Sequence, residues 1–414
     1  MQKSAYSTPT SPQLRWYWPE IAISIVVGLG MVWYYNWIVL ELQTETDIQA
    51  HIIYLAKICD QDYQWPANPG FHWVTWMLAG KSCDVQYLLR VATWVLGGCW
   101  GLSTYLAMWA GQQLIDDSPA APARRAWPHM AGMIVAAVAA CFMFSLPSGW
   151  LLDNYDIYLG MLPPNLYHNS TLIGAMPFSI AALGLALRQL RRNAIPGFGT
   201  DAVLGLLLVV GALFKPSFAF AFVPAYGICR LLRGRQTFWR HFAGLLLVTV
   251  PVALLIAGQS WWIVAYPEMN MHGKSEIGFA FPAGWKTFMP NLTPKQSVML
   301  GLGSFVLPIL AYVLRPSWLR KPAHQLLVLS TVFATAQFLL VYETGGRAGH
   351  GNFIWQVVAT NHWLYWLVTL EILYWQTTTT SERIRQVILV CGIAASIVSG
   401  IIYLSAIGTT GTYH

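Results

Sequence analysis

The chain consists of long apolar runs separated by short polar segments. The first run, IAISIVVGLGMVWYYNWIVL at 21–40, has 20 mostly apolar residues, which is about the length that a helix needs to cross a bilayer. Each later run of similar length predicts a further helix. These runs lie at 87–109, 128–147, 171–188, 242–260, 297–314, 323–342, 353–375 and 386–406.

One further apolar region, 202–229, is interrupted in its middle. DAVLGLLLVVGALF and FAFAFVPAYGIC flank the sequence Lys215-Pro216-Ser217. A lysine followed by a proline predicts two short helices that run out and back, because proline cannot continue a helix. The pattern therefore predicts an all-α, polytopic transmembrane bundle of about eleven spans, formed by a single domain over 1–414.

Composition agrees with a membrane protein. The chain is 56% hydrophobic and only 10% charged, against roughly 25% charged residues in soluble domains. If 202–229 runs out and returns, 16 of the 24 basic residues fall on one side of the predicted spans, which marks that side as cytoplasmic and places the N-terminus inside and the C-terminus outside. They are Lys3, Arg15, Arg124, Arg125, Arg188, Arg191, Arg192, Arg230, Arg233, Arg235, Arg240, Arg315, Arg320, Lys321, Arg383 and Arg385.

The net charge of +7 is thus a topology signal and predicts affinity for anionic lipid, and no nucleic-acid partner is expected. Acids and histidines concentrate on the opposite, outer face. They are Glu41, Glu45, Asp47, Asp60, Asp62, Asp84, Asp153, Asp156, Glu268, Glu276 and Glu343, with His51, His72, His168, His272 and His350.

Two sizeable outer loops are predicted, at 41–85 and 261–296. The first is long enough for one or two interfacial helices, and its Trp and Tyr content suits the headgroup level. Cys59 and Cys83 both lie in this loop, so the two can form a disulfide if the loop faces an oxidising compartment. No CxxC motif or Cys/His metal spacing occurs.

The segment TETDIQAHIIYL follows directly on the first span. If it is helical, Asp47, His51 and Tyr54 share one face and apolar side chains line the other. The polar stripe would then look into a cavity above the membrane. The alternative is a solvated helix end, in which Thr44 caps the helix, Glu45 and Asp47 complement its N-terminal dipole, and His51 is solvated.

A second polar segment, YDIYLGMLPPNLYHNST, lies before the span that begins near residue 171. It groups Asp156, Asn165, His168 and Asn169 around a double proline that prevents a helix start and fixes an extended turn. These side chains are candidates for orienting a substrate. An ordinary loop with Asn169 as a helix cap is the alternative, but it does not explain His168.

A third segment, YETGGRAGHGNFIW, interleaves Glu343, Arg347, His350 and Asn352 with four glycines between two spans. Such a turn lets the backbone and a guanidinium close on an anionic group. Lys215 is a fourth candidate, because a lysine in an apolar region is costly and marks a functional site, with snorkelling to the outer interface as the competing explanation.

Together these features resemble the GT-C superfamily of integral membrane glycosyltransferases. The resemblance rests on an acidic residue in a helical first outer loop and on cations at the outer ends of later spans. The motifs PPNLYHNST, FKPSF and HGNFIW also look like those of uncharacterised bacterial membrane proteins of surface-polysaccharide loci. The first loop reads TETDIQAH rather than an Asp-x-Asp or Glu-Asp pair, which leaves the catalytic base open between two residues.

The resemblance implies an inverting transfer of a sugar from a polyprenyl-phosphate-linked donor to a glycan or lipid-linked acceptor, on the periplasmic face of a bacterial inner membrane or on a luminal face. It implies Asp47 as the general base, with Glu45 second. Donor-phosphate binding would fall to Arg347, His350 and Lys215. Substrate binding would involve His51, Asp156, Asn165, His168, Asn169, Glu343 and Asn352.

No metal site or other cofactor is assigned. Asp47 and His51 could share a divalent metal, but two ligands are too few to define a site. A lipid-linked polysaccharide polymerase or ligase would use much the same outer residues. A transporter or flippase is the alternative from another class, although such proteins usually contain repeated halves, which this sequence lacks. A purely structural subunit would not need this one-sided polar concentration.

Overall fold

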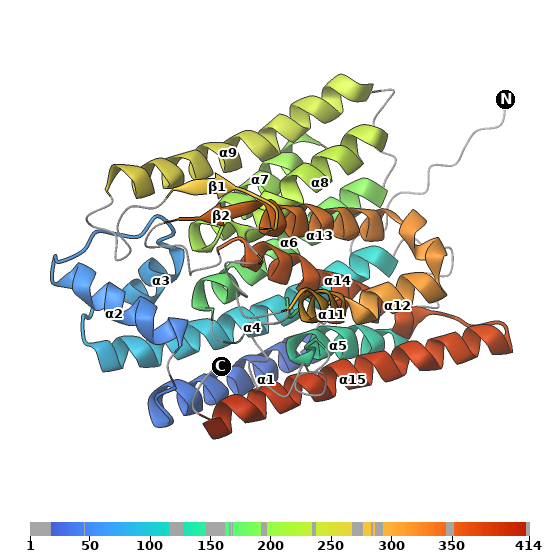
Figure 1. The fold of residues 1–414 in the computed structure, drawn as a ribbon, viewed down its shortest axis with the longest axis horizontal. Coiled ribbons are helices and arrows are strands. Elements are labelled where there is room, and N and C mark those ends of the chain that lie inside the picture. Colours follow the sequence, from blue (N-terminus) through green and yellow to red (C-terminus); the bar gives the residue numbers. More distant parts are fainter. Residues whose placement is uncertain are drawn as a thin grey trace.

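The protein is an α-helical bundle with one short β-ribbon (Figure 1). The computed structural model describes residues 18–44, 46–115, 127–145, 162–164, 167, 169–191, 197–233, 237–266, 276–282, 285, 293–344 and 352–410. The all-α class predicted from the apolar runs is therefore confirmed over the described residues.

Helices occupy each of the predicted apolar runs. α1 (Trp18–Tyr35) continues through a π-helical segment, η1 (Asn36–Glu41), and α2 (Asp47–Cys59) and α3 (Gly70–Leu78) form the first loop. The bundle then contains α4 (Val85–Ile115), α5 (Trp127–Phe142), α6 (Ser170–Arg191), α7 (Phe198–Phe214), α8 (Ser217–Arg233), α9 (Phe238–Ala265), α11 (Pro294–Gly303), α12 (Val306–Leu314), the 3-10 helix η6 (Pro316–Arg320), α13 (Pro322–Leu340), α14 (Ile354–Tyr374) and α15 (Thr380–Thr410).

Five of the described helical segments have the length and apolar composition of a membrane span. They are Trp18–Glu41, Ser170–Leu190, Phe238–Ala265, Pro322–Leu340 and Thr380–Ile407, and shorter apolar helices lie at Met130–Phe142 and Phe198–Phe214. These segments have the character of a helical membrane protein. The total of eleven crossings stays a prediction.

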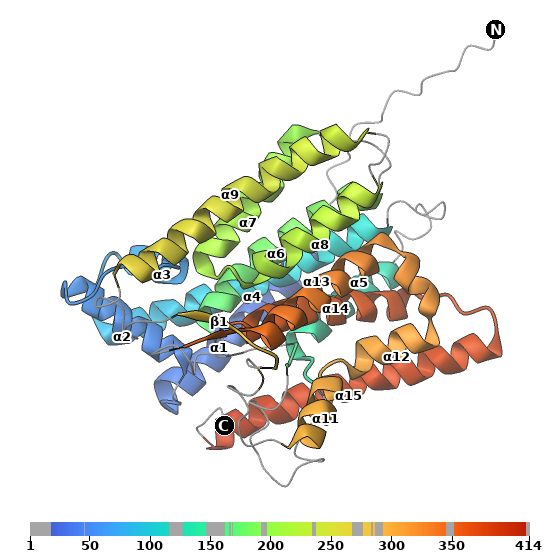
Figure 2. The same ribbon diagram turned by 45° about the horizontal axis from the view of Figure 1, so that its top comes forward.

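The bundle has two layers. Helices α1, α4, α6, α7 and α9 pack side by side in that order, and α5, α14, α13 and α8 pack across them (Figures 1 and 2). Every residue of α14 from 354 to 370 is buried. The core of the molecule therefore lies along α14, and the N-terminal end of this helix reaches the candidate site.

The predicted hairpin at 202–229 is present as α7 and α8. Helix α7 ends at Phe214 and α8 begins at Ser217, so the turn is Lys215-Pro216 as the sequence indicated. At the far end of the hairpin, Arg230 Nη2 donates to Asp201 Oδ2 at 2.9 Å, and both side chains are buried. This ion pair joins the C-terminus of α8 to the N-terminus of α7, so the two helices are antiparallel.

The run at 297–314 is not one helix, contrary to the single span predicted there. It breaks between α11 and α12 at Ser304. The backbone carbonyl of Ser304 accepts hydrogen bonds from Asn361 Nδ2 at 3.0 Å and Tyr365 Oη at 3.1 Å. Side chains of α14 thus donate hydrogen bonds to a carbonyl that the helix leaves unpaired. These bonds offset the free-energy cost of breaking the helix inside the bundle.

The two ends of the bundle differ in chemistry. Helices α2 and α3 lie together at one end (Figure 1), and Cys59 at the end of α2 forms a disulfide with Cys83, just before α4. The other end of the bundle carries Arg233, at the C-terminus of α8, and Lys321, just before the N-terminus of α13. The structure thus separates the loop acids from these basic residues, while the membrane side that each end faces stays a prediction.

Candidate functional site

Three of the predicted site residues form a continuous polar chain at the α2 end of the bundle. Asn169 Nδ2 donates to Asp47 Oδ2 at 3.0 Å, and Lys215 Nζ donates to Asn169 Oδ1 at 3.2 Å. The amide therefore lies between the carboxylate and the ammonium and faces each with the atom that suits its charge. Residues separated by more than one hundred positions in the sequence meet here.

Asn169 is held by the start of α6. Its Oδ1 also accepts from the backbone N–H of Leu172 at 2.9 Å and from Thr171 Oγ1 at 3.1 Å. The first of these bonds is a helix N-cap, as the alternative interpretation of the PPNLYHNST segment proposed. Only 2% of Asn169 is exposed, so its side chain is packed inside the folded protein.

Lys215 lies in the turn between α7 and α8, where its side chain is half-buried. Its Nζ also donates to Thr171 Oγ1 at 3.4 Å and lies 5.0 Å from the centre of the Trp355 ring, a cation–π contact. Burial lowers the pKa of Lys215 to about 8, while the charges of Asp47 and Glu343 oppose the decrease. At neutral pH the lysine is therefore mostly a cation held inside the protein.

Glu343 and Asn352 approach the same place from the other side. Glu343 ends β2 (Val341–Glu343), and Asn352 Nδ2 donates to Glu343 Oε2 at 2.6 Å, just before α14 begins. The Glu343 charge acts on Lys215. Two predicted substrate-binding residues thus border the polar chain, and α2, α6, the α7–α8 turn, β2 and α14 all contribute to one site.

Asp47 occupies the first turn of α2, but the helix cap is not the predicted one. Thr46 rather than Thr44 caps the helix, because Thr46 Oγ1 accepts from the N–H of Gln49 and the Gln49 side chain accepts from the N–H of Thr46. This capping box fixes the direction in which α2 starts. Asp47 complements the helix dipole, as the alternative interpretation of this segment proposed, and it also accepts the hydrogen bond from Asn169.

His51 contacts a second histidine of the first loop. Its Nδ1 lies 3.1 Å from Nε2 of His72, a residue of α3. Tyr54 donates to the backbone carbonyl of Gln64 at 2.8 Å and stacks on Tyr63. His51 and Tyr54 thus pack against other parts of the first loop, and the cavity beside the polar stripe of α2 stays a prediction.

Sequence reasoning did not find His72, which lies on an ordinary amphipathic helix. Burial lowers the pKa of His72 to about 4, so this ring is neutral at pH 7. Thr171 and Trp355 were also missed as site residues. Thr171 follows Asn169 by two positions, and Trp355 ends the HGNFIW motif. Their closeness in sequence to predicted site residues is the feature that could have identified them.

The remaining predicted site residues lie outside the described part of the chain. They are Glu45, Asp156, Asn165, His168, Arg347 and His350. Their roles stay predictions. Among the described residues, no group of three or more His, Cys, Asp or Glu side chains is arranged to hold a metal ion.

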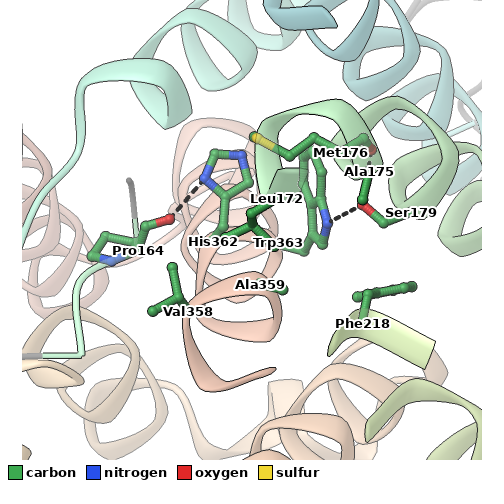
Figure 3. Close-up of a pocket in the computed structure, with 10 residues that line it drawn as sticks. All are labelled: Pro164, Leu172, Ala175, Met176, Ser179, Phe218, Val358, Ala359, His362 and Trp363. Carbon is green, nitrogen blue, oxygen red and sulfur yellow. Dashed lines mark hydrogen bonds between the residues drawn. The ribbon is translucent and has the colours of Figure 1, made fainter. Parts of the chain in front are cut away.

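A small interior pocket is lined by residues about one helical turn after members of the polar chain, among them Leu172 on α6 and Phe218 on α8 (Figure 3). Its cavity is about 20 Å³, enough for one water molecule and too small for a sugar. His362 Nδ1 donates to the Pro164 carbonyl at 2.9 Å, and Trp363 Nε1 donates to Ser179 Oγ at 2.9 Å. The first bond fixes the second proline of the PPNLYHNST motif against α14, and the second joins α14 to α6.

Comparisons of the chain with protein-family models and with curated proteins give no match. The functional argument therefore rests on the site chemistry.

Proposed function

We propose that the protein is a membrane glycosyltransferase that uses a polyprenyl-phosphate-linked sugar donor at the end of the bundle that carries α2 and α3. The observation that best supports this proposal is the fixed chain from Asp47 through Asn169 to Lys215. Sugar transfer from a phosphate needs a base for the acceptor hydroxyl and a cation for the leaving phosphate. This chain holds one candidate of each kind in a defined geometry.

Asp47 is the proposed general base. A carboxylate at the start of a helix, half-buried and bound by one amide N–H, retains lone pairs with which to accept a proton. Asn169 orients this carboxylate and is therefore proposed as a positioning residue, not as a direct substrate ligand. Glu45 remains the second candidate base.

Lys215 is proposed to face the donor phosphate, with Arg347 and His350. Two of its three N–H groups are used by Asn169 and Thr171, and an ammonium has three to donate. The described residues Asp47 and Glu343 carry more negative charge than Lys215 can neutralise. Phosphate binding in this proposal therefore depends on Arg347, whose guanidinium can bind two phosphate oxygens at once.

The proposed location is a bacterial inner membrane with the site on the periplasmic face. The disulfide between Cys59 and Cys83 supports this orientation, because disulfides persist in oxidising compartments. The end of the bundle with the polar chain is the end with the disulfide. Exposed Trp73 and Trp261 near it are candidates for contact with sugar faces or with headgroups.

A polysaccharide polymerase or ligase remains the nearest alternative, since it would need the same base and cations and would differ only in the acceptor. A transporter is less well supported. Its ionisable groups would lie near the middle of the bilayer, whereas Asp47, Lys215 and Glu343 lie in turns and at element ends.

The test replaces Asp47 by asparagine. The amide keeps the shape and one oxygen but cannot take the acceptor proton, so we expect sugar transfer to fall by roughly 10²-fold or more while binding of polyprenyl phosphate stays nearly unchanged. Transfer is measured from a polyprenyl-phosphate donor, and lipid binding in a separate titration. Glu45→Gln is the matched control and should cost much less.

An Asp47→Asn enzyme with near-normal turnover would remove Asp47 as the base.

A second variant tests the cations. Arg347→Ala should abolish turnover and weaken donor binding, because each hydrogen bond between charged groups contributes about 1.5–3 kcal/mol. Unchanged donor binding in this variant would exclude Arg347 as the phosphate ligand.

A further inference from the structure

The β-ribbon has an apolar face that no described part of the protein covers. Strand β1 (Ile277–Phe279) pairs antiparallel with β2, and the register places Ile277 opposite Glu343 and Phe279 opposite Val341. Directly opposed residues share a face of the sheet. Ile277 is 61% exposed, Phe279 78% and Phe281, just past the strand, 73%.

The ribbon is well ordered by its own contacts. The N–H of Ala280 donates to the Leu340 carbonyl at 3.0 Å, and the N–H of Thr344 donates to the Glu276 carbonyl at 2.9 Å. These bonds extend the ladder at both ends. On the opposite face, the ring of Tyr342 fills the space over Gly278, where a Cβ atom would lie within 2.7 Å of it. Large apolar side chains are therefore held outward by a formed structure.

The neighbouring surface indicates what covers this face. Strand β2 begins directly after α13, which contacts it and has the composition of a membrane span. Helix α13 exposes apolar side chains, among them Val332 and, next to β2, Leu340. The apolar face of the ribbon continues from this helix, so one medium would contact both elements.

We propose that the outward face of the β1–β2 ribbon inserts into the lipid interface beside the candidate site. An open sheet edge is not tolerated in the hydrocarbon centre, because its N–H and C=O groups would lack partners. The ribbon therefore lies at the boundary between headgroups and acyl chains, with its Phe281 end towards the acyl chains and its Glu343 end towards the headgroups.

The direction of the strands predicts which residues of the ribbon lie deeper in the membrane. β2 continues outward from the end of α13, so Glu343 is its outermost residue, and β1 runs back from Ile277 towards Phe281. At about 3.3 Å per strand residue, Phe279 lies about 7 Å deeper than Ile277. The polar end of the ribbon is Glu343, whose charge acts on Lys215, so the inserted face leads from the lipid to the polar chain.

The inference builds on the proposed membrane setting of the site, and its test measures depth instead of activity. Single cysteines replace Ile277, Phe279 or Phe281 in a background where Cys99 and Cys391, the free cysteines that are not buried, are alanine. Each carries a nitroxide label, and the full-length protein is placed in lipid nanodiscs. Accessibility to oxygen and to a water-soluble nickel complex gives the depth of each label.

Two reference positions calibrate the scale. Leu254, 68% exposed in the middle of α9, should report the bilayer centre, and Asp62, exposed in the first loop, should report water. We expect the ratio of oxygen to nickel accessibility to increase from 277 through 279 to 281, with all three between the references.

Three results would overturn the inference. Labels at 277, 279 and 281 that match Asp62 would place the ribbon in water, and a reversed order would contradict the strand direction. Low accessibility to both reagents would show that protein, such as a second copy of this chain, covers the face. Because no turnover is measured, these outcomes do not depend on whether the protein transfers sugars.

Discussion

Replacing Asn169 by alanine removes the amide between Asp47 and Lys215. Loss of the N-cap bond to Leu172 alone costs about 1 kcal/mol of unfolding free energy. Each hydrogen bond to a charged group contributes about 1.5–3 kcal/mol, and Asn169 makes two of them. These contributions share one side chain, and Lys215 keeps its bond to Thr171, so they do not add fully. We expect a total loss of about 3 kcal/mol.

Equilibrium unfolding in detergent micelles measures this loss. Thr46→Ala is the matched control, because Thr46 also caps a helix but does not contact an ammonium; it should cost about 1 kcal/mol. The reasoning is refuted if Asn169→Ala costs no more than Thr46→Ala. That result would mean that Asn169 is only a cap and that the contacts of its amide with Asp47 and Lys215 contribute nothing to stability.

An aspartate at position 169 separates the charge effect from the cap. Asn169→Asp keeps an acceptor for the Leu172 N–H and for Lys215 but places a second carboxylate beside Asp47. Two adjacent carboxylates raise the pKa of the pair in the folded state. The penalty is therefore present at neutral pH and disappears as the pH falls towards 4, where the folded pair binds a proton. A pH-independent penalty would contradict this account.

Three further predictions concern other parts of the fold. Binding of polyprenyl phosphate should weaken as the pH rises through about 8, where Lys215 loses its proton. In a binding titration, the Lys215→Arg variant should keep its affinity to about pH 10. Because the folded-state pKa of Lys215 is below the ordinary value of 10.5, the free energy of unfolding should rise between pH 8 and 10.5. Replacing Cys59 and Cys83 by serine should cost about 2–4 kcal/mol, seen as the difference between oxidised wild type and variant in micelle unfolding. Asp201→Asn should cost about 3–5 kcal/mol because it leaves Arg230 buried without its counter-ion, and a cost below 1 kcal/mol would show that water reaches the pair.

The apolar runs predicted the helices well because each run is about as long as a bilayer crossing requires and has few charges. The α7–α8 turn was predictable for a local reason, since Lys215-Pro216 cannot continue a helix. The break at Ser304 was not, because it depends on donors from α14 that are more than fifty residues away. The ribbon was also missed, since three-residue strands are too short to show a period.

The candidate site shows the same division. Asp47, Asn169, Lys215, Glu343 and Asn352 were selected because polar residues beside apolar runs are costly, and the structure brings them together. Their individual contacts could not be predicted. Sequence spacing placed His51 beside Asp47, but the packing of α3 against α2 pairs it with His72 instead, and the cap at Thr46 depends on Gln49 rather than on the position of the apolar run.

The α7–α8 hairpin has a consequence for the surrounding bilayer. Each of its helices has 17 residues, which gives a length of about 25 Å at 1.5 Å per residue, less than the ~30 Å thickness of the hydrocarbon core. One face of α7 exposes Val203 and Leu206, so in a bilayer we expect lipid to contact this short helix directly. Lipids adapt to a short hydrophobic stretch by thinning locally. We expect the membrane to dip beside α7, which would bring headgroups down to Lys215 instead of requiring the lysine to reach up to them.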